Sequence, residues 1–149
     1  MIKRILTYPS DKEILMSKSE EVTDVNEVKD LIQDLKDTLK NTSGVGISAV
    51  QIGVLKKVCI IKYNGEYITM INPVITRTRD KVLFQEGCLS APAVYTTVER
   101  AKKVWVEYLD ETGKKRELDQ GGLCSVIIQH ELDHYEGGCE VFKEIKEDI

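Results

Sequence analysis

Apolar residues recur at helical spacing over residues 24–40. Asp24 can cap this segment, Glu27 follows three residues later, and the polar run from Asn41 to Gly44 can end it. Its apolar positions lie three or four residues apart, at Val28, Leu31, Ile32, Leu35 and Leu39. The pattern therefore predicts an amphipathic helix over residues 24–40.

A second segment with helical spacing lies near the end of the chain. One stripe of this segment carries Leu123, Val126, Ile127, His130 and His134. The pair Gly137-Gly138 follows and can end the helix. Because the two histidines continue an apolar stripe, we expect them to point toward the protein interior.

Between the two predicted helices the pattern is typical of strands. Residues 57–63 are rich in β-branched side chains, and Asn64-Gly65 is a strong hairpin turn into a returning strand over residues 67–75, broken at Asn72-Pro73. Alternation resumes over residues 103–109, and a turn at 111–113 leads into residues 115–118. Strands in meander order with a helix at each end predict an α+β fold, in which antiparallel β-sheets pack around the C-terminal helix.

Composition predicts a single ordinary globular domain over residues 1–149. Apolar residues make up 42% of the chain and charged residues 31%, and the net charge of -4 argues against a nucleic-acid-binding surface. No apolar run is long enough to cross a bilayer, and the first residues carry no apolar signal core, so we expect a cytoplasmic protein. The four cysteines have no disulfide-framework spacing. We expect three of them to be ordinary thiols, with Cys88 as the exception.

The candidate chemistry starts at His130-Glu131-Leu132-Asp133-His134. Two histidines four residues apart project from one face of a helix and can bind one metal ion. Glu131 points away from the ligand pair and can still reach a water at the metal, where a general base must lie. The alternative is a pair of core histidines beside a surface glutamate, but a buried imidazole needs a partner, which a metal supplies.

A catalytic site of this kind usually has a third protein ligand, and the chain has no third histidine. The residues that remain possible are Cys59, Cys88, Cys124, Glu136, Cys139, Glu140 and Glu144. Cys59 lies in an apolar run, and Cys124 lies at a different angle on the helix. Cys88 follows Gly87 and precedes Pro92, which marks a constrained, non-regular segment rather than a core strand. A thiolate at Cys88 could coordinate a metal.

Three motifs in order resemble those of peptide deformylases. They are residues 44–51 (GVGISAVQ), 86–90 (EGCLS) and 129–134 (QHELDH), and residues 5–9 (ILTYP) resemble the opening of that family. The resemblance covers nearly the whole chain. It implies a deformylase-like fold and a metal-dependent hydrolase that removes the N-formyl group from the initiator methionine of new polypeptides, releasing formate.

The resemblance also implies roles for individual residues. Cys88, His130 and His134 would bind one divalent ion, most typically Fe(II), with Zn, Ni or Co as substitutes. Glu131 would be the acid/base, while the Gln51 side chain and the Leu89 N–H would donate to the oxyanion. The partners would be N-formyl-methionyl nascent peptides and the ribosome that delivers them, with no nucleic acid or membrane, and we expect a monomer.

Substrate contacts are expected from the glycine-rich loop and from apolar side chains. Val45 and Gly46 could pair with an extended peptide. The full expected substrate-binding set is Val45, Gly46, Phe84, Gly87, Leu123, Val126 and Ile127. An ion network of Glu86, Arg100 and Asp133 could fix the metal ligands from behind.

The chain departs from the family pattern at Ser48, Tyr95, Tyr135 and Cys139. Ser48 stands where Ala is usual, and Tyr135 and Cys139 stand where Leu is usual; none of these changes removes an expected ligand or donor. Three alternatives stay open: a non-catalytic homologue, a zincin-type protease with a glutamate ligand downstream of His134, and a structural zinc site.

Overall fold

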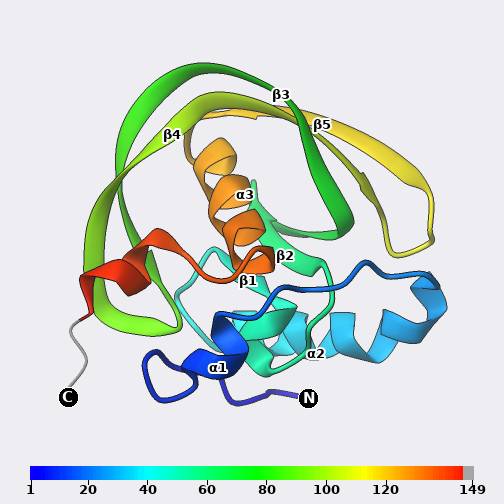
Figure 1. The fold of residues 1–149 in the computed structure, drawn as a ribbon. Helices are drawn as coiled ribbons and strands as arrows, with labels where there is room; N and C mark the ends of the chain where they lie inside the picture. The colour runs from blue at the N-terminus through cyan, green and yellow to red at the C-terminus, as the bar shows by residue number, and fades with distance from the viewer. Residues whose placement is uncertain (146–149) are drawn as a thin grey trace.

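In a computed structural model, which describes residues 1–145, long curved strands arch over a central helix, α3 (Figure 1). The last four residues of the predicted domain lie outside the described residues. The helices are α1 (Lys12–Leu15), α2 (Lys29–Lys40) and α3 (Gly122–Tyr135), with 3-10 turns η1 (Val25–Val28), η2 (Ala49–Ile52) and η3 (Glu140–Glu144). The strands are β1 (Gly46–Ser48), β2 (Val58–Tyr63), β3 (Glu66–Cys88), β4 (Ala91–Leu109) and β5 (Lys115–Gly121).

The strands form one antiparallel sheet in the order β1-β2-β3-β4-β5. The hairpin between β2 and β3 turns at Asn64 and Gly65, whose φ angles of 50° and 79° are those of the predicted two-residue turn. The predicted α+β fold around a C-terminal helix is therefore confirmed, and the five strands found in the described part of the chain belong to one bent sheet.

Two strands are much longer than the sequence pattern predicted. Strand β3 was expected to end at residue 75 and β4 to begin at residue 103, but the two pair along residues 71–109. The added residues of β3 are mostly exposed and highly charged, so their polar and apolar residues do not alternate. The predicted break at Asn72-Pro73 is a register shift within β3, and Asn72 has a φ of 50° there. Such irregularities bend a strand.

The predicted helix over residues 24–40 is confirmed, with its first turn wound as the 3-10 turn η1. The Asp24 side chain accepts a hydrogen bond from the Asn26 N–H at 3.0 Å, which caps the turn. The apolar face of α2 consists of Ile32, Leu35 and Leu39. It packs into a core cluster that also contains residues of β1 and β2.

Helix α3 is buried on almost every side because the bent sheet surrounds it (Figure 1). Of the stripe predicted to face the interior, Val126, Ile127 and the two histidines are buried. Leu123, at the start of the helix, is 51% exposed. Cys59 on β2 and Cys124 on α3 itself are both buried in one core cluster, as expected. The burial of α3 brings the polar side chains of its second half inside the protein.

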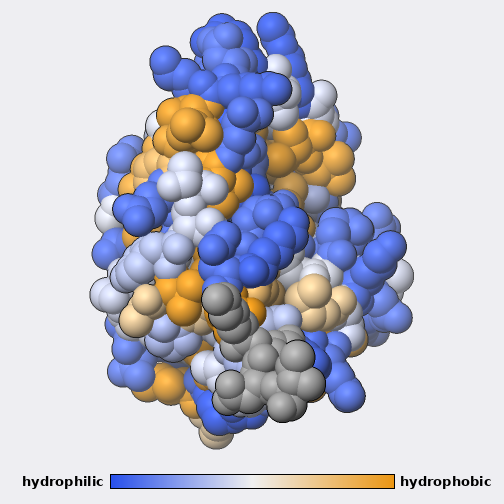
Figure 2. Space-filling model, turned by 60° about the vertical axis from the view of Figure 1, so that its left-hand side comes forward, coloured by the Kyte–Doolittle hydropathy of each residue, from blue (hydrophilic) through white to orange (hydrophobic). Residues whose placement is uncertain are grey.

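On the face shown in Figure 2, hydrophobic side chains lie in separate patches between hydrophilic ones. No helix within residues 1–145 is long and apolar enough to cross a membrane.

Candidate metal centre

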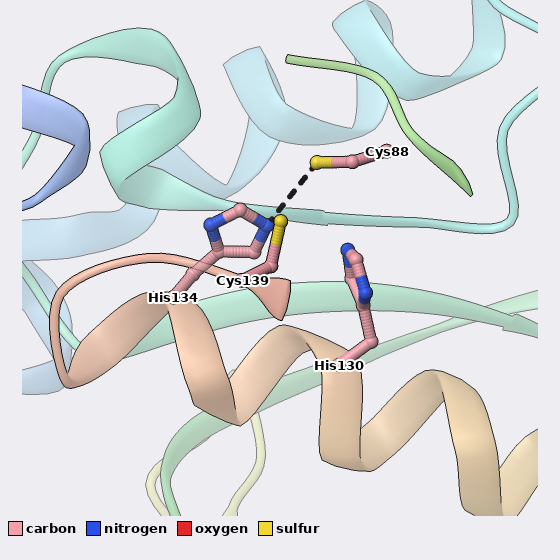
Figure 3. A group of neighbouring side chains, drawn as sticks. All are labelled: Cys88, His130, His134 and Cys139. Carbon is pink, nitrogen blue, oxygen red and sulfur yellow. Dashed lines mark hydrogen bonds between the residues drawn. The ribbon is translucent and has the colours of Figure 1, made fainter. Parts of the chain in front are cut away.

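Three separate segments bring metal-binding side chains together (Figure 3). His130 and His134 project from one face of α3, and Cys88 ends β3 beside them. Cys139 joins them from the turn between α3 and η3. The donor atoms of these four residues all lie within 4.8 Å of one another.

The spacing of these atoms fits a metal ion. The Cys88 Sγ lies 3.5 Å from the His134 Nε2. Metal–sulfur and metal–nitrogen bonds of tetrahedral zinc place two such donors about 3.6 Å apart. Cys88 is partly exposed, whereas both histidines are buried, so the group is closed on the core side and open on one side.

His130 is oriented by a buried ion network. Its Nδ1 lies 2.8 Å from the Glu86 Oε1, which leaves Nε2 available to a metal. Arg100 binds both oxygens of Glu86, at 2.6 and 2.8 Å, and the Asp133 Oδ2 at 2.7 Å. The predicted contact of Glu86, Arg100 and Asp133 is confirmed. Such partners fix the ring and tautomer of a metal ligand.

The same network sets the charges behind the ligands. Burial would raise the pKa of Glu86, but the hydrogen bonds from Arg100 and His130 outweigh it and lower the pKa to about 2. Burial would likewise lower the pKa of His130, but Glu86 outweighs it and raises the pKa to about 9 in the metal-free protein. Glu86 is therefore a fixed anion behind the imidazole.

His134 is held differently, by packing. Its ring meets the Phe142 ring edge-on at 5.8 Å and the His130 ring at 5.1 Å. Its Nδ1 has no hydrogen-bond partner within residues 1–145. Both histidines thus belong to the group of metal-binding donors. His130 is oriented by the Glu86 anion and His134 by aromatic contacts.

Glu131 is buried beside the donor group and is not the surface residue of the alternative interpretation. The Ser48 hydroxyl lies 3.0 Å from both its Oε1 and its backbone carbonyl oxygen. Burial raises the pKa of Glu131, while His130 and His134 act in the opposite direction. A carboxyl group with a raised pKa is suited to accept and return a proton near neutral pH.

The Gln51 carboxamide is fixed in orientation. Its Oε1 accepts from the Ser48 N–H at 2.9 Å, so its Nε2 turns toward the Ser90 Oγ at 3.1 Å and the Cys88 Sγ at 3.7 Å. Leu89 lies in the turn between β3 and β4, directly after Cys88. Both predicted oxyanion donors are therefore next to the thiol.

A cavity of about 510 Å³ opens over the group of donors. Apart from His134, which lies behind it, every predicted site residue lines this cavity. Those on its wall are Val45, Gly46, Gln51, Phe84, Gly87, Cys88, Leu89, Leu123, Val126, Ile127, His130 and Glu131. The predicted apolar pocket and the predicted chemical groups thus share one space.

Strand β1 borders the cavity and is an edge of the sheet within residues 1–145. The Lys62 N–H donates to the Val45 carbonyl at 2.8 Å, and Gly46 is opposite Ile61. Because hydrogen-bonded and non-bonded pairs alternate in antiparallel strands, the Gly46 N–H and C=O point away from β2. That edge is available to an extended peptide.

The glutamates downstream of the histidines, Glu136, Glu140 and Glu144, lie outside the group of donors. Glu140 pairs with Lys143 at 2.8 Å and Glu144 bonds Thr96 at 3.1 Å, so neither joins the donor group. Cys139 is a buried thiol, as expected, but its sulfur also lies in the donor group, where only Cys88 was singled out. The closeness of the two sulfurs raises the pKa of Cys88 and lowers that of Cys139.

Sequence reasoning also missed several cavity residues. Residues 92–94 line the cavity from the unpredicted part of the β3–β4 hairpin, and the buried Ser90 behind them binds Gln51. The ring of Tyr95 covers Gly87, where an added Cβ would lie 2.9 Å from the ring. A side chain at position 87 would therefore have to displace the exposed Tyr95 ring.

Comparisons with known proteins agree with this geometry. A family profile described as polypeptide deformylase matches residues 2–147. The peptide deformylase of Thermodesulfovibrio yellowstonii is 37% identical over 142 residues, covering 91% of this chain and 85% of that protein. The peptide deformylase of Aquifex aeolicus is 40% identical over 144 residues, covering 92% and 84%. A crystal structure of a peptide deformylase from Legionella pneumophila has a TM-score of 0.90 at 37% identity, covering 99% of this chain and 87% of that one.

Proposed function

Because this chain belongs to the polypeptide deformylase family, we propose that Cys88, His130 and His134 bind its catalytic metal and that Glu131 moves the proton of the reaction. The family is metal-dependent, and the chain is a hydrolase that removes the N-formyl group from newly made polypeptides, releasing formate. The observation that carries the residue assignment is the group of sulfur and imidazole donors at one end of a cavity, with a buried glutamate beside it.

The proton transfer falls to Glu131. A divalent ion in this donor set supplies Lewis acidity and makes water nucleophilic near neutral pH. Glu131 then takes a proton from the attacking water and delivers it to the amine nitrogen as the C–N bond of the formamide breaks. Burial excludes bulk water from Glu131, and the Ser48 hydroxyl fixes one of its oxygens.

The negative charge that develops on the formyl oxygen needs hydrogen-bond donors. We assign these to the Gln51 Nε2 and the Leu89 N–H, which flank Cys88. Such donors contribute about 3 kcal/mol each to transition-state stabilisation. Since the Ser48 N–H holds the Gln51 oxygen, the amide nitrogen faces the site before substrate arrives.

The substrate is proposed to enter as an added strand. The Gly46 N–H and C=O would bind the peptide backbone, and the methionine side chain would fill the apolar part of the cavity. Gly87 would border the peptide from the β3–β4 hairpin. The apolar side chains that line this region are Val45, Phe84, Leu123, Val126 and Ile127.

We further propose Fe(II) as the native metal, as the resemblance to peptide deformylases implies. Zn, Ni or Co could replace it, because thiolate and imidazole donors bind these transition metals as well. Activity of metal-free protein reloaded anaerobically with each ion tests this assignment. A cytoplasmic monomer that works near the ribosome fits a substrate that is a newly made chain. Light scattering tests the monomeric state, and co-sedimentation with ribosomes tests the association with the ribosome.

The deciding experiment measures formate released from a formyl-Met peptide, together with the metal content of the same sample. Glu131→Gln should lower kcat/KM by at least about 100-fold with unchanged metal content. Glu99→Gln is the matched control, because Glu99 is exposed and, among the described residues, forms an ion pair only with Lys81. A fully active Glu131→Gln variant would contradict the assignment, and metal-loaded wild type without turnover would favour the non-catalytic alternative.

Cys88→Ser tests the ligand assignment separately. We expect a large loss of bound metal, whereas a zincin-type site with a downstream glutamate would keep its metal. The exposed positions and other partners of Glu140 and Glu144 already argue against that site.

A further inference from the structure

Cys139 is the fourth member of the donor group and lies outside the three motifs. Figure 3 shows its sulfur beside the His134 ring, on the side that faces Cys88 and His130. The residue is only 4% exposed. Its sulfur lies within 4.8 Å of the donor atoms of Cys88, His130 and His134.

The backbone fixes the position of this sulfur. After α3 the chain passes through Gly137 and Gly138, whose φ angles of 113° and 114° suit glycine. An added Cβ at Gly137 would lie 2.9 Å from the Met16 carbonyl oxygen. Cys139 then precedes η3 as its N-cap residue.

The segment after Cys139 is anchored in the core. Val141 and Phe142 are buried in a cluster with Leu6 and Leu15, and the Phe142 ring stacks on the Tyr8 ring at 4.7 Å. The Cys139 sulfur is thus held next to the other donors by packing on both sides of the residue.

We propose that the Cys139 Sγ binds the same metal ion as a fourth protein ligand in the resting enzyme. This inference rests on the proposed metal site. Two sulfurs and two imidazoles complete a tetrahedral set, which is the arrangement of closed zinc sites. Water and substrate would then gain access by replacing Cys139 or by raising the coordination number.

The other buried thiols show what an uninvolved cysteine looks like in this protein. Cys124 lies on the same helix as the histidines and is 9% exposed, but its neighbours are core side chains. Burial alone accounts for the raised pKa of Cys124, about 11. It belongs to no donor group within residues 1–145. Cys124 is therefore the matched control for Cys139.

The test uses the full chain loaded with Co(II), whose sulfur-to-cobalt charge-transfer absorbance reports the bound thiolates. Cys139→Ala should lower the absorbance per bound ion to about half, and Cys124→Ala should leave it unchanged. Full absorbance in Cys139→Ala would overturn the proposal. Unchanged absorbance in Cys88→Ala would instead overturn the proposed metal site, so the two failures are distinguishable.

A second measurement needs no variant. X-ray absorption of the wild-type protein loaded with zinc should give two sulfur and two nitrogen neighbours around the ion. One sulfur would overturn the role of Cys139, even if its variants failed to fold. No sulfur at all would overturn the proposed site as well.

Discussion

The Ser48 hydroxyl lies 3.0 Å from the Glu131 carboxylate, although the two residues are 83 positions apart in the chain. The hydroxyl carries one proton, which it shares between this carboxylate and the Glu131 backbone carbonyl. Ser48 ends β1 and Glu131 lies on α3, so this contact joins the edge strand to the helix that carries the two histidines.

Replacing Ser48 by alanine should change the acidity of Glu131. The hydrogen bond favours the carboxylate, so its loss should raise the pKa of Glu131 and move the acidic limb of the kcat/KM profile to higher pH. We expect a decrease in kcat of about tenfold or less. Ser125→Ala is the control, since Ser125 is buried on α3 but bonds Ala101. An unshifted limb would show that Ser48 does not act on Glu131.

Gly46→Ala should impair catalysis through a direct clash. The added Cβ would lie 2.5 Å from the Glu131 Oε2, so either the carboxylate or β1 must move. We expect kcat to fall by at least about tenfold, since small displacements of catalytic groups are costly. Gly121→Ala is the control, because its Cβ would meet only the Lys102 carbonyl at 3.5 Å. Equal kcat values for Gly46→Ala and Gly121→Ala would refute the proposed effect of the clash with Glu131.

Arg100→Met should destabilise the protein and weaken metal binding. Glu86 is 4% exposed and would be left as a buried anion without its main partner. Breaking such a pair costs about 3–5 kcal/mol of unfolding free energy, and loss of a group that orients a ligand lowers metal affinity about 10–100-fold. Urea unfolding and metal titration measure the two effects.

The control for Arg100 is Arg116→Met. Arg116 pairs with Asp110 at 2.9 Å and is 51% exposed, so its loss should cost at most about 1 kcal/mol. Similar unfolding free energies for both variants would mean that the buried network has no special role.

Removing the metal by chelation should lower the melting temperature and abolish activity together. An ion present at a hundred times its dissociation constant stabilises the folded state by about 2.7 kcal/mol, which corresponds to roughly 5–10 °C for a domain of this size. Calorimetry before and after readdition checks this. A melting temperature that does not change when the metal is removed would mean that the ion does not bind at the proposed site in the folded protein.

The site was more predictable from sequence than the strands that carry it. The histidine pair needed only helical periodicity, which α3 obeys, and Cys88 needed the family motif. The long middle of β3 and β4 was missed because charged residues on an exposed strand do not alternate with apolar ones.

Cys139 illustrates a different limit. Its distance from His134 along the chain is short, but two glycines of positive φ decide where its sulfur points. No periodic pattern predicts such a turn. Ser48 was noticed as a departure from the family, yet its partner Glu131 could be identified only once β1 and α3 were placed side by side.

The free edge of β1 also limits when the reaction can occur. An edge strand pairs only with an extended backbone, so an amino terminus already wound into a helix or packed into a domain cannot bind there. Deformylation by the proposed strand pairing would therefore compete in time with folding of the nascent chain. The proposed recognition through the backbone of Gly46 would also make little demand on the residues that follow the methionine, which would suit an enzyme that must process many different proteins.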